Sequence, residues 1–284
     1  MSTVRKTRPL ARSCAALLAL FAAVCSAQPM AQAPRAPELG QPGKDVVWVP
    51  TPERLIVRML QMADTTSADL VVDLGSGDGR IPIAAAKRFG ARGLGIEYDE
   101  GLVQLSIRSA RREGVAERVR FLREDLFQAD LSGASVVALY VSPEIMLRLR
   151  PRLFALKPAT RIVSHQFTLG DWEPDESATV EGRLAYLWVV PARVHGSWRL
   201  RLGADDYVLR LEQEYQKLSG SAEAAGMRTP VFGARLRGEA IRFMFVDRNG
   251  DPRAFEGEVK GEAMQGSVHM YQRPESAWSA RRVP

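Results

Sequence analysis

A glycine-rich turn between a predicted strand and a predicted helix constrains this chain more than any other feature. Residues 70–73 are apolar up to an acidic end, residues 81–89 form an alanine-rich helical pattern, and Gly75, Gly77 and Gly79 lie between them. Glycine permits backbone conformations that a β-carbon forbids and lets a ligand come close. The helix after the turn points its positive N-terminal end at the same place. The pattern therefore predicts the opening unit of a nucleotide-binding α/β sheet.

The remaining periodicity predicts two architectures in succession. Apolar strands expected at 93–96, 119–122, 135–141 and 161–167 alternate with helices expected at 53–63, 100–114 and 143–156, the last interrupted at Pro151. This alternation is typical of a Rossmann-like α/β sheet with helices on both faces, and a strand at 184–194 is expected antiparallel on its edge. Residues 196–284 contain short alternating segments and a hairpin-turn signal at 248–251. They predict an antiparallel β unit, either a small barrel or an extension docked on the first domain.

The first 27 residues have the layout of a secretory signal. Four basic residues precede an apolar run at 14–24, and a small-residue cleavage site ends at Ala27. The run is short for a membrane span. Both cysteines lie in this segment, so cleavage would leave a chain without disulfides or thiolate metal ligands, and no metal site is predicted.

Four regions are therefore expected: a signal at 1–27, a flexible linker at 28–45, an α/β domain at 46–195 and a β-rich domain at 196–284. We expect an exported, periplasmic protein, or a membrane-associated protein facing the cytoplasm if the signal is kept as an anchor. The formal charge of +6 is uneven, because 35 basic and 33 acidic side chains remain after residue 27. Charge therefore gives no reason to expect a nucleic-acid partner.

Acidic residues follow the predicted strands at positions that suit a nucleotide ligand. Asp73 precedes the glycine turn, where a carboxylate suits a cationic amino-acid group better than a pyrophosphate. Glu97 ends the next strand, 24 residues later, and a carboxylate at that spacing can accept hydrogen bonds from both ribose hydroxyls. The alternative for Glu97 is a surface acid at a strand end.

The segment Val-Val-Asp-Leu-Gly-Ser-Gly-Asp-Gly-Arg at 71–80 resembles motif I of class I S-adenosylmethionine (SAM) methyltransferases. Further similar segments lie at 49–52, 95–97, 125–127, 140–143 and 164–167. Together they resemble, over residues 46–172, the small class I methyltransferases related to the mitochondrial ATP synthase c-subunit lysine methyltransferase. The resemblance implies a class I methyltransferase fold, SAM as the cofactor, and in-line N-methylation of a lysine amine on a protein, with a membrane protein as one candidate acceptor.

The resemblance also implies site residues. The expected cofactor-binding residues are Asp73, Gly75, Ser76, Gly77, Asp78, Gly79, Glu97, Tyr98, Asp125 and Leu126. Asp125 would accept from the adenine amino group, with Glu124 as a substitute, while Leu126 or Phe127 packs against the ring.

The acceptor side is less defined by the sequence. Tyr140 is expected either to contact the target amine or to be a core tyrosine, and His165 either to act as a base or to be structural. An Asn-Pro-Pro-Tyr signature is absent after the strand at 135–141, which argues against methylation of nucleic-acid bases or glutamine. Thr51 is predicted to cap the first helix, with Pro52 in its first turn. This helix is expected to cover the sheet, and the alternative is that the Pro-Thr-Pro turn at 50–52 also lines the cofactor pocket.

Three other functions fit parts of the sequence. A small-molecule methyltransferase would differ only in its acceptor pocket. An exported, non-catalytic SAM-binding or scaffold protein would explain an outward signal on a chain whose cofactor is made in the cytosol. An NAD-dependent oxidoreductase is disfavoured because the glycines form GxGxG and not GxGxxG.

Overall fold

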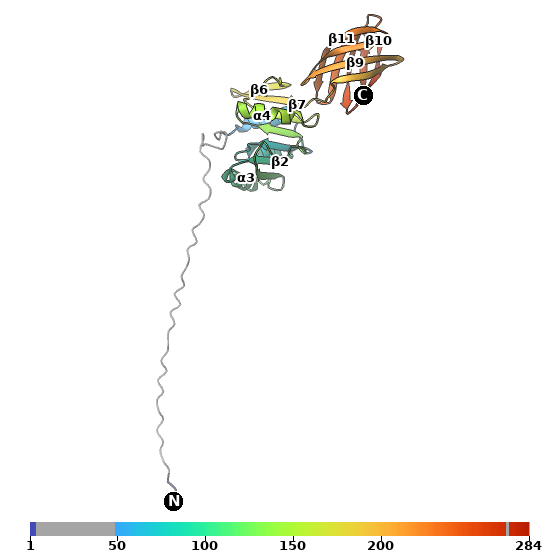
Figure 1. Ribbon diagram of the computed structural model, residues 1–284. Helices are drawn as coiled ribbons and strands as arrows, with labels where there is room; N and C mark the ends of the chain where they lie inside the picture. Colours follow the sequence, from blue (N-terminus) through green and yellow to red (C-terminus); the bar gives the residue numbers. More distant parts are fainter. Residues whose placement is uncertain (4–48, 271–272, 284) are drawn as a thin grey trace. The chain divides into compact units, whose positions relative to one another are not determined.

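The computed structural model describes residues 1–3, 49–270 and 273–283 of the chain (Figure 1). The predicted linker, and the predicted signal beyond its first three residues, lie outside this part. None of the helices in the described ranges is both long enough and apolar enough to cross a membrane.

A seven-stranded sheet forms the first folded region, in the order β3-β2-β1-β4-β5-β7-β6. Its strands are β1 (Leu70–Leu74), β2 (Arg92–Glu97), β3 (Val119–Arg123), β4 (Val136–Leu139), β5 (Arg161–His165), β6 (Glu176–Val180) and β7 (Arg183–Val189). Strands β1 to β5 pair in parallel, whereas β7 runs antiparallel to β5 and β6. The strand order reverses between β1 and β4, and ligands bind at the carboxyl ends of strands beside such a reversal.

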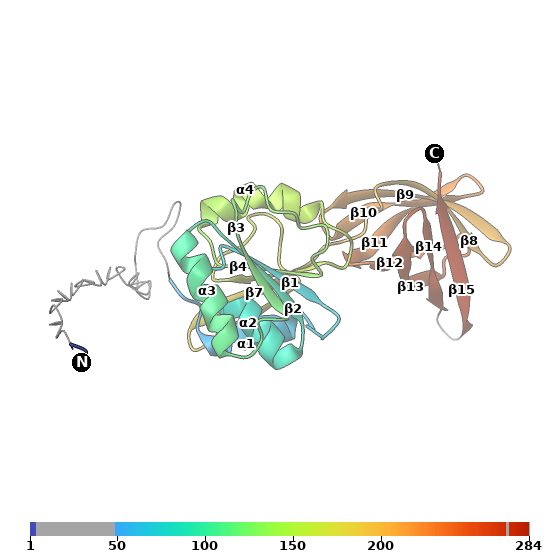
Figure 2. The same cartoon turned by 90° about the horizontal axis from the view of Figure 1, so that it is seen from below.

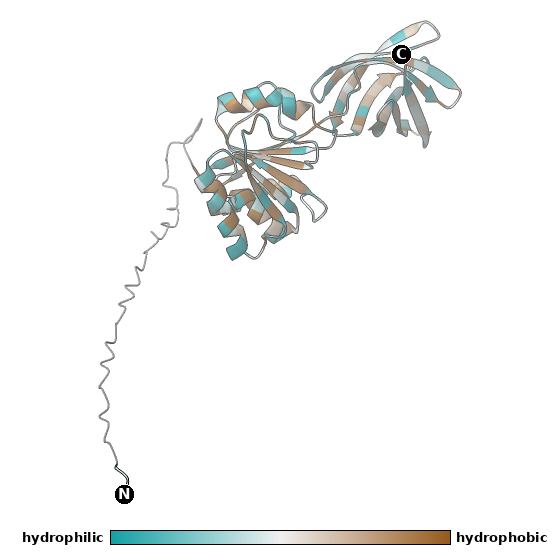
Figure 3. Cartoon of the chain, turned by 60° about the horizontal axis from the view of Figure 1, so that its bottom comes forward, coloured by the Kyte–Doolittle hydropathy of each residue, from teal (hydrophilic) through white to brown (hydrophobic). Residues whose placement is uncertain are grey.

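Four helices cover the two faces of the sheet (Figure 2). They are α1 (Glu53–Met62), α2 (Arg80–Phe89), α3 (Glu100–Arg112) and α4 (Pro143–Phe154). Alternate residues of each strand point to opposite faces, so Val71 packs with α1 and α2 while Val72 packs with α4. The central strands are apolar on both faces, as Figure 3 shows by colour. The predicted Rossmann-like sheet with helices on both faces is thus confirmed.

Two local predictions for this region were wrong, and one strand was missed. Helix α4 continues through Pro151. Proline has no N–H to donate to the Leu147 carbonyl, but its own carbonyl still accepts from the Ala155 N–H at 3.1 Å. Strand β7 stops at Val189, two residues before Pro191. Strand β6 was not predicted, because its half-exposed residues carry no continuous apolar run.

The C-terminal region is a closed antiparallel barrel of eight strands, in the order β10-β11-β12-β13-β14-β15-β8-β9. The strands are β8 (Gly196–Leu202), β9 (Asp205–Glu214), β10 (Lys217–Ala224), β11 (Met227–Arg237), β12 (Ala240–Val246), β13 (Pro252–Lys260), β14 (Ala263–Met270) and β15 (Arg273–Arg282). The predicted antiparallel β unit is confirmed. The sequence did not predict β10, β11 or β15, and the first two of these are rich in small and polar residues.

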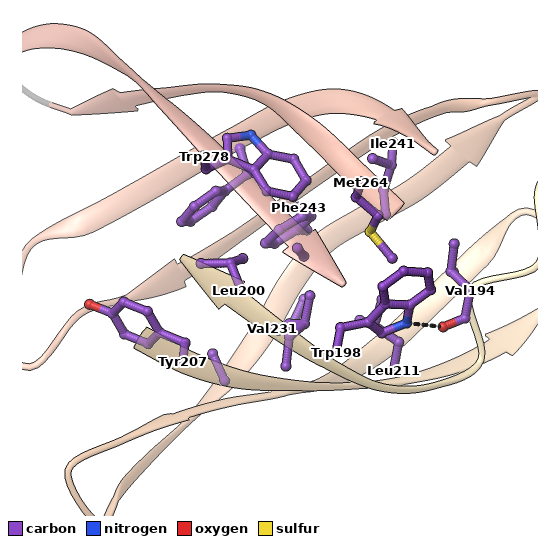
Figure 4. Close-up of a cluster of buried hydrophobic side chains, with 14 of the residues drawn as sticks. Val194, Trp198, Leu200, Tyr207, Leu211, Val231, Ile241, Phe243, Met264 and Trp278 are labelled. Carbon is purple, nitrogen blue, oxygen red and sulfur yellow. Dashed lines mark hydrogen bonds between the residues drawn. The ribbon is translucent and has the colours of Figure 1, made fainter. Parts of the chain in front are cut away.

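Aromatic and aliphatic side chains fill the barrel (Figure 4). The Phe243 and Phe255 rings stack with centroids 4.7 Å apart, and Trp278 meets both edge-on. Trp198 is fully buried and satisfies its indole N–H by donating to the Val194 carbonyl at 2.8 Å. These contacts make the interior a packed core, as the alternating pattern of β12 required.

Candidate active site

The three glycines of the turn at the carboxyl end of β1 all adopt left-handed backbone conformations. Their φ values are +78° at Gly75, +55° at Gly77 and +79° at Gly79. The backbone N–H groups of Gly75 and Ser76 both donate to the Ile96 carbonyl on β2, at 2.9 Å. The turn is therefore fastened to the end of the neighbouring strand.

Gly79 is also required by packing, because it is the N-cap of α2 and lies against α3 and β3. A β-carbon at Gly79 would lie 2.6 Å from the Phe121 ring and 2.8 Å from Ser106 Cβ. Ser106 in turn donates from its buried hydroxyl to the Gly77 carbonyl at 3.1 Å. Helix α3 thus packs against the glycine turn and stabilises its conformation.

Replacing Gly79 by alanine is expected to destabilise the protein by about 2–3 kcal/mol, since it combines left-handed strain with overpacking. Urea denaturation would measure the loss. Gly133→Ala is the matched control, because a β-carbon there meets Leu70 at an ordinary 3.6 Å. Equal effects of the two substitutions would contradict the packing described for Gly79.

Glu97, at the end of β2, lies against the glycine turn. Its Oε2 accepts from the Gly77 backbone N–H and its Oε1 from the Asp99 N–H, both at 2.9 Å. Each carboxylate oxygen keeps lone-pair capacity for a further donor. The side chain is half-buried and suits the ribose role expected for it.

Asp73 is buried beside the same turn and is 2% exposed. No side-chain hydrogen bond or ion pair joins it to another described residue. Burial raises its pKa well above the usual value, and the charges of Glu97 and Asp78 raise it further. The buried Ser76 hydroxyl likewise has no partner within the described part of the chain. These groups fit a polar, cationic ligand portion, so the residues present suit the amino-acid end of SAM.

The expected adenine residues follow β3, next to Glu97. The Glu124 N–H donates to the Glu97 carbonyl at 3.0 Å, and Asp125 Oδ1 accepts from the Phe127 N–H at 2.9 Å. Asp125 and its apolar neighbour Leu126 are half-buried. Tyr98 is 48% exposed at the end of β2. The fold therefore brings Asp73 of β1, Glu97 of β2 and the acids that follow β3 to one sheet edge, while the choice between Asp125 and Glu124 stays a prediction.

The two acceptor-side candidates lie together at the ends of β4 and β5. The ring centroids of Tyr140 and His165 are 3.8 Å apart, with the planes tilted by 30°. His165 is 1% exposed, and its Nδ1 lies 3.1 Å from the Thr51 hydroxyl oxygen. The predicted capping role of Thr51 is wrong, because the N-cap of α1 is Pro52 and has no side-chain bond. The Thr51 hydroxyl contacts His165 instead. The two residues are 114 positions apart in the sequence, so no local sequence signal predicts this contact.

Burial, with a smaller contribution from the nearby Arg183 charge, lowers the pKa of His165 from 6.5 to about 4. Between pH 4 and pH 6.5, His165 is therefore protonated in the unfolded chain but neutral in the folded protein. His165 contributes stability above pH 6.5, and this contribution is lost as the pH falls toward 4. The loss is about 3 kcal/mol at about 1.4 kcal/mol per pKa unit. We expect His165→Gln to flatten the pH dependence of urea denaturation in this window. His195→Gln, at an exposed histidine, is the control; an unchanged slope in His165→Gln would contradict the assignment.

The described residues offer no metal centre, because they contain no group of three or more His, Cys, Asp or Glu side chains able to hold an ion. The site therefore consists of a glycine turn, three strand-end acids and an aromatic pair.

Several known proteins are similar to this same region of the chain. The family model of the ANTKMT methyltransferase domain matches residues 73–176. A protein-lysine N-methyltransferase of Saccharolobus islandicus is 37% identical over 151 residues, which cover 51% of this chain and 94% of that protein. The human ATP synthase c-subunit lysine N-methyltransferase is 37% identical over 136 residues, 48% of this chain and 57% of that protein.

Among solved structures, an RNA methyltransferase from Salinibacter ruber in complex with S-adenosyl-L-homocysteine is similar. It is 48% identical, with a TM-score of 0.51, and the match covers 51% of this chain and 96% of that one. The matches to both the bacterial structure and the Saccharolobus islandicus protein span nearly the whole of those shorter chains.

Proposed function

Because the chain belongs to the SAM-dependent methyltransferase family that includes the Saccharolobus islandicus protein-lysine N-methyltransferase, we propose that its substrate is a lysine amine on a protein. The single observation that carries the proposal is this relative, which is 37% identical and matched over 94% of its length. The human relative, named for a lysine of the ATP synthase c-subunit, supports the same acceptor chemistry.

SAM supplies an electrophilic methyl group on a sulfonium centre. The residues of this chain would bind and orient it: Asp73 the amino group, Glu97 the ribose, and Asp125 with Leu126 the adenine. Their placement at one sheet edge leaves the ends of β4 and β5 for the acceptor. Holding the amine in line with the methyl group, away from water, supplies much of the rate in such transfers. A strong base is not required if the amine arrives neutral.

The proposal is tested with purified protein and tritiated SAM, using poly-L-lysine and a bacterial membrane extract as acceptors. We expect label in protein that resists nuclease, is removed by protease, and hydrolyses to methylated lysine. Failure to label any protein, despite tight binding of S-adenosylhomocysteine, would contradict the lysine proposal. It would leave a small-molecule acceptor or a non-catalytic SAM-binding role.

RNA is a second candidate acceptor, because the 48% identical Salinibacter ruber structure is of an RNA methyltransferase. The loop after β4 here reads Tyr140-Val141-Ser142-Pro143 and lacks the Asn-Pro-Pro-Tyr signature, which favours the protein acceptor. Total RNA in the same labelling assay distinguishes the two, since nuclease would then remove the label.

We further propose that the protein is exported and that its acceptor lies at or near a membrane. The support is the basic and apolar pattern of residues 1–27 and the membrane location of the candidate acceptor class. Sequencing the mature N-terminus from fractionated cells is the test. A start at Gln28 in the periplasmic fraction is expected, and an intact N-terminus in the cytosol would contradict export.

A further inference from the structure

We propose that Tyr140 is the side chain that receives the acceptor amine, and that Thr51, His165 and Arg80 are positioning residues that hold its ring beside the cofactor turn. The inference rests on the proposed lysine acceptor. It assigns a role to contacts between distant segments that the cofactor site does not use.

Tyr140 lies where the transferred methyl group is expected. It directly follows β4, and the next residue, Val141, packs on the glycine turn: a β-carbon on Gly75 would lie 3.2 Å from Val141 Cγ1. Tyr140 is half-buried, while Val141 and His165 are buried. Of these three neighbouring residues, Tyr140 is therefore the one whose side chain a ligand can reach.

The ring of Tyr140 is supported by two other rings. The His165 imidazole lies 3.8 Å away, centroid to centroid, and the nearly parallel Phe167 ring lies 6.2 Å away. Phe167 is carried there by a tight turn in which Gln166 has φ +70° and the Ser164 hydroxyl donates to the Phe167 carbonyl at 2.8 Å. A non-glycine residue in this region is strained, and such strain concentrates at functional sites.

The rings of Tyr140, His165 and Phe167 together form an aromatic wall. Such a wall suits an alkylammonium or amine ligand. The face of a tyrosine ring attracts cations, and neutral neighbours avoid repelling them. His165 is such a neighbour, since burial lowers its pKa to about 4 and so holds it neutral at higher pH. The wall therefore favours a lysine side chain over an anionic or phosphate-bearing acceptor.

A chain of hydrogen bonds joins this wall to the cofactor turn. Asp78, within the glycine turn, accepts from Arg80 Nε at 2.8 Å and from a second guanidinium nitrogen at 2.6 Å. Arg80 also donates to the Thr51 carbonyl at 3.0 Å. The Thr51 hydroxyl then meets His165, which supports Tyr140. Through these contacts the segment Asp78-Gly79-Arg80 fixes the position of the aromatic wall relative to the cofactor turn.

The test uses a bisubstrate probe, a SAM analogue in which nitrogen replaces the sulfonium sulfur and carries a 2-aminoethyl chain in place of the methyl group, so that its amine lies close to the position of the acceptor nitrogen. Its affinity relative to S-adenosylhomocysteine, measured by calorimetry, isolates the acceptor subsite without needing the natural acceptor. We expect wild type to bind the probe at least about tenfold more tightly, as one desolvated cation–aromatic contact and its neighbours would give.

Tyr140→Ala and the bulkier Tyr140→Leu are expected to lose this excess while keeping the S-adenosylhomocysteine affinity within about twofold, which also reports that the site is folded. Thr51→Val is expected to lose part of the excess, and Thr51→Ser, which keeps the hydroxyl, to retain it. A merely structural Thr51 would lower both affinities together.

The outcomes separate the two proposals. If wild type shows no excess for the probe, the lysine-amine function itself fails, and this inference fails with it. If wild type shows the excess and both Tyr140 variants keep it, the amine function stands and the assignment of Tyr140 is overturned. If Thr51→Val keeps the full excess, the positioning chain is overturned.

Discussion

Replacing Asp73 by asparagine is expected to weaken SAM binding by about 100-fold or more and, at the same time, to make the ligand-free protein more stable. The carboxylate is buried without a partner among the described residues, so it is available to pair with the ligand's amino group. A buried charge-assisted contact of this kind is worth about 3 kcal/mol. Asparagine keeps the shape but loses the charge.

The gain in stability follows from the raised pKa of Asp73, which is caused first by burial and then by the charges of Glu97 and Asp78. The folded protein binds the proton more tightly than the unfolded chain, so this stabilisation is present at low pH and is lost as the pH rises through the folded pKa. At neutral pH the buried Asp73 carboxyl therefore opposes folding.

Thermal melts at pH 7.5 would show this effect for Asp73→Asn. Since about 1 kcal/mol shifts Tm by roughly 2–4 °C in a chain of this size, we expect a rise of a few degrees without ligand and almost no further rise with SAM. Asp130→Asn, at an exposed acid, is the control for the substitution. Wild-type affinity in Asp73→Asn would remove the basis for the cofactor site.

Replacing Asp247 by alanine is expected to destabilise the barrel by about 3–5 kcal/mol, because it leaves a buried arginine without its main partner. The Asp247 and Arg253 side chains are 2% and 7% exposed. Asp247 Oδ2 accepts from Arg253 Nε at 2.8 Å, and Oδ1 accepts from the backbone N–H groups of Asn249 at 2.8 Å and Asp251 at 3.0 Å. One side chain thus organises the β12–β13 turn and neutralises the arginine.

Urea denaturation would measure this loss. Asp206→Ala breaks an exposed pair with Arg201 and is expected to leave the denaturation midpoint almost unchanged. The double substitution Asp247→Ala with Arg253→Leu should recover part of the stability, because the unpaired charge is removed. A loss no larger than that of Asp206→Ala would show that the buried pair is not needed.

The sequence by itself determined those helices, strands and turns that form through interactions between residues close together in the chain. The apolar runs that became β1, β4 and β5, the helix after Gly79, and the turn at 248–251 each carry a local signal. The acids Asp73 and Glu97 could be placed for the same reason, since the carboxyl ends of adjacent parallel strands share one edge of the sheet. Strands β6 and β10, which lack a continuous apolar run, were missed.

Only the tertiary structure decided the contacts between distant segments. Thr51 reads as a helix cap, yet its hydroxyl meets His165, and Tyr140 and His165 become a pair only because β4 and β5 lie side by side. Barrel closure likewise depends on β15 pairing with β8. Such pairings are selected by packing and by the need to satisfy buried polar groups over the whole fold, which no short stretch of sequence encodes.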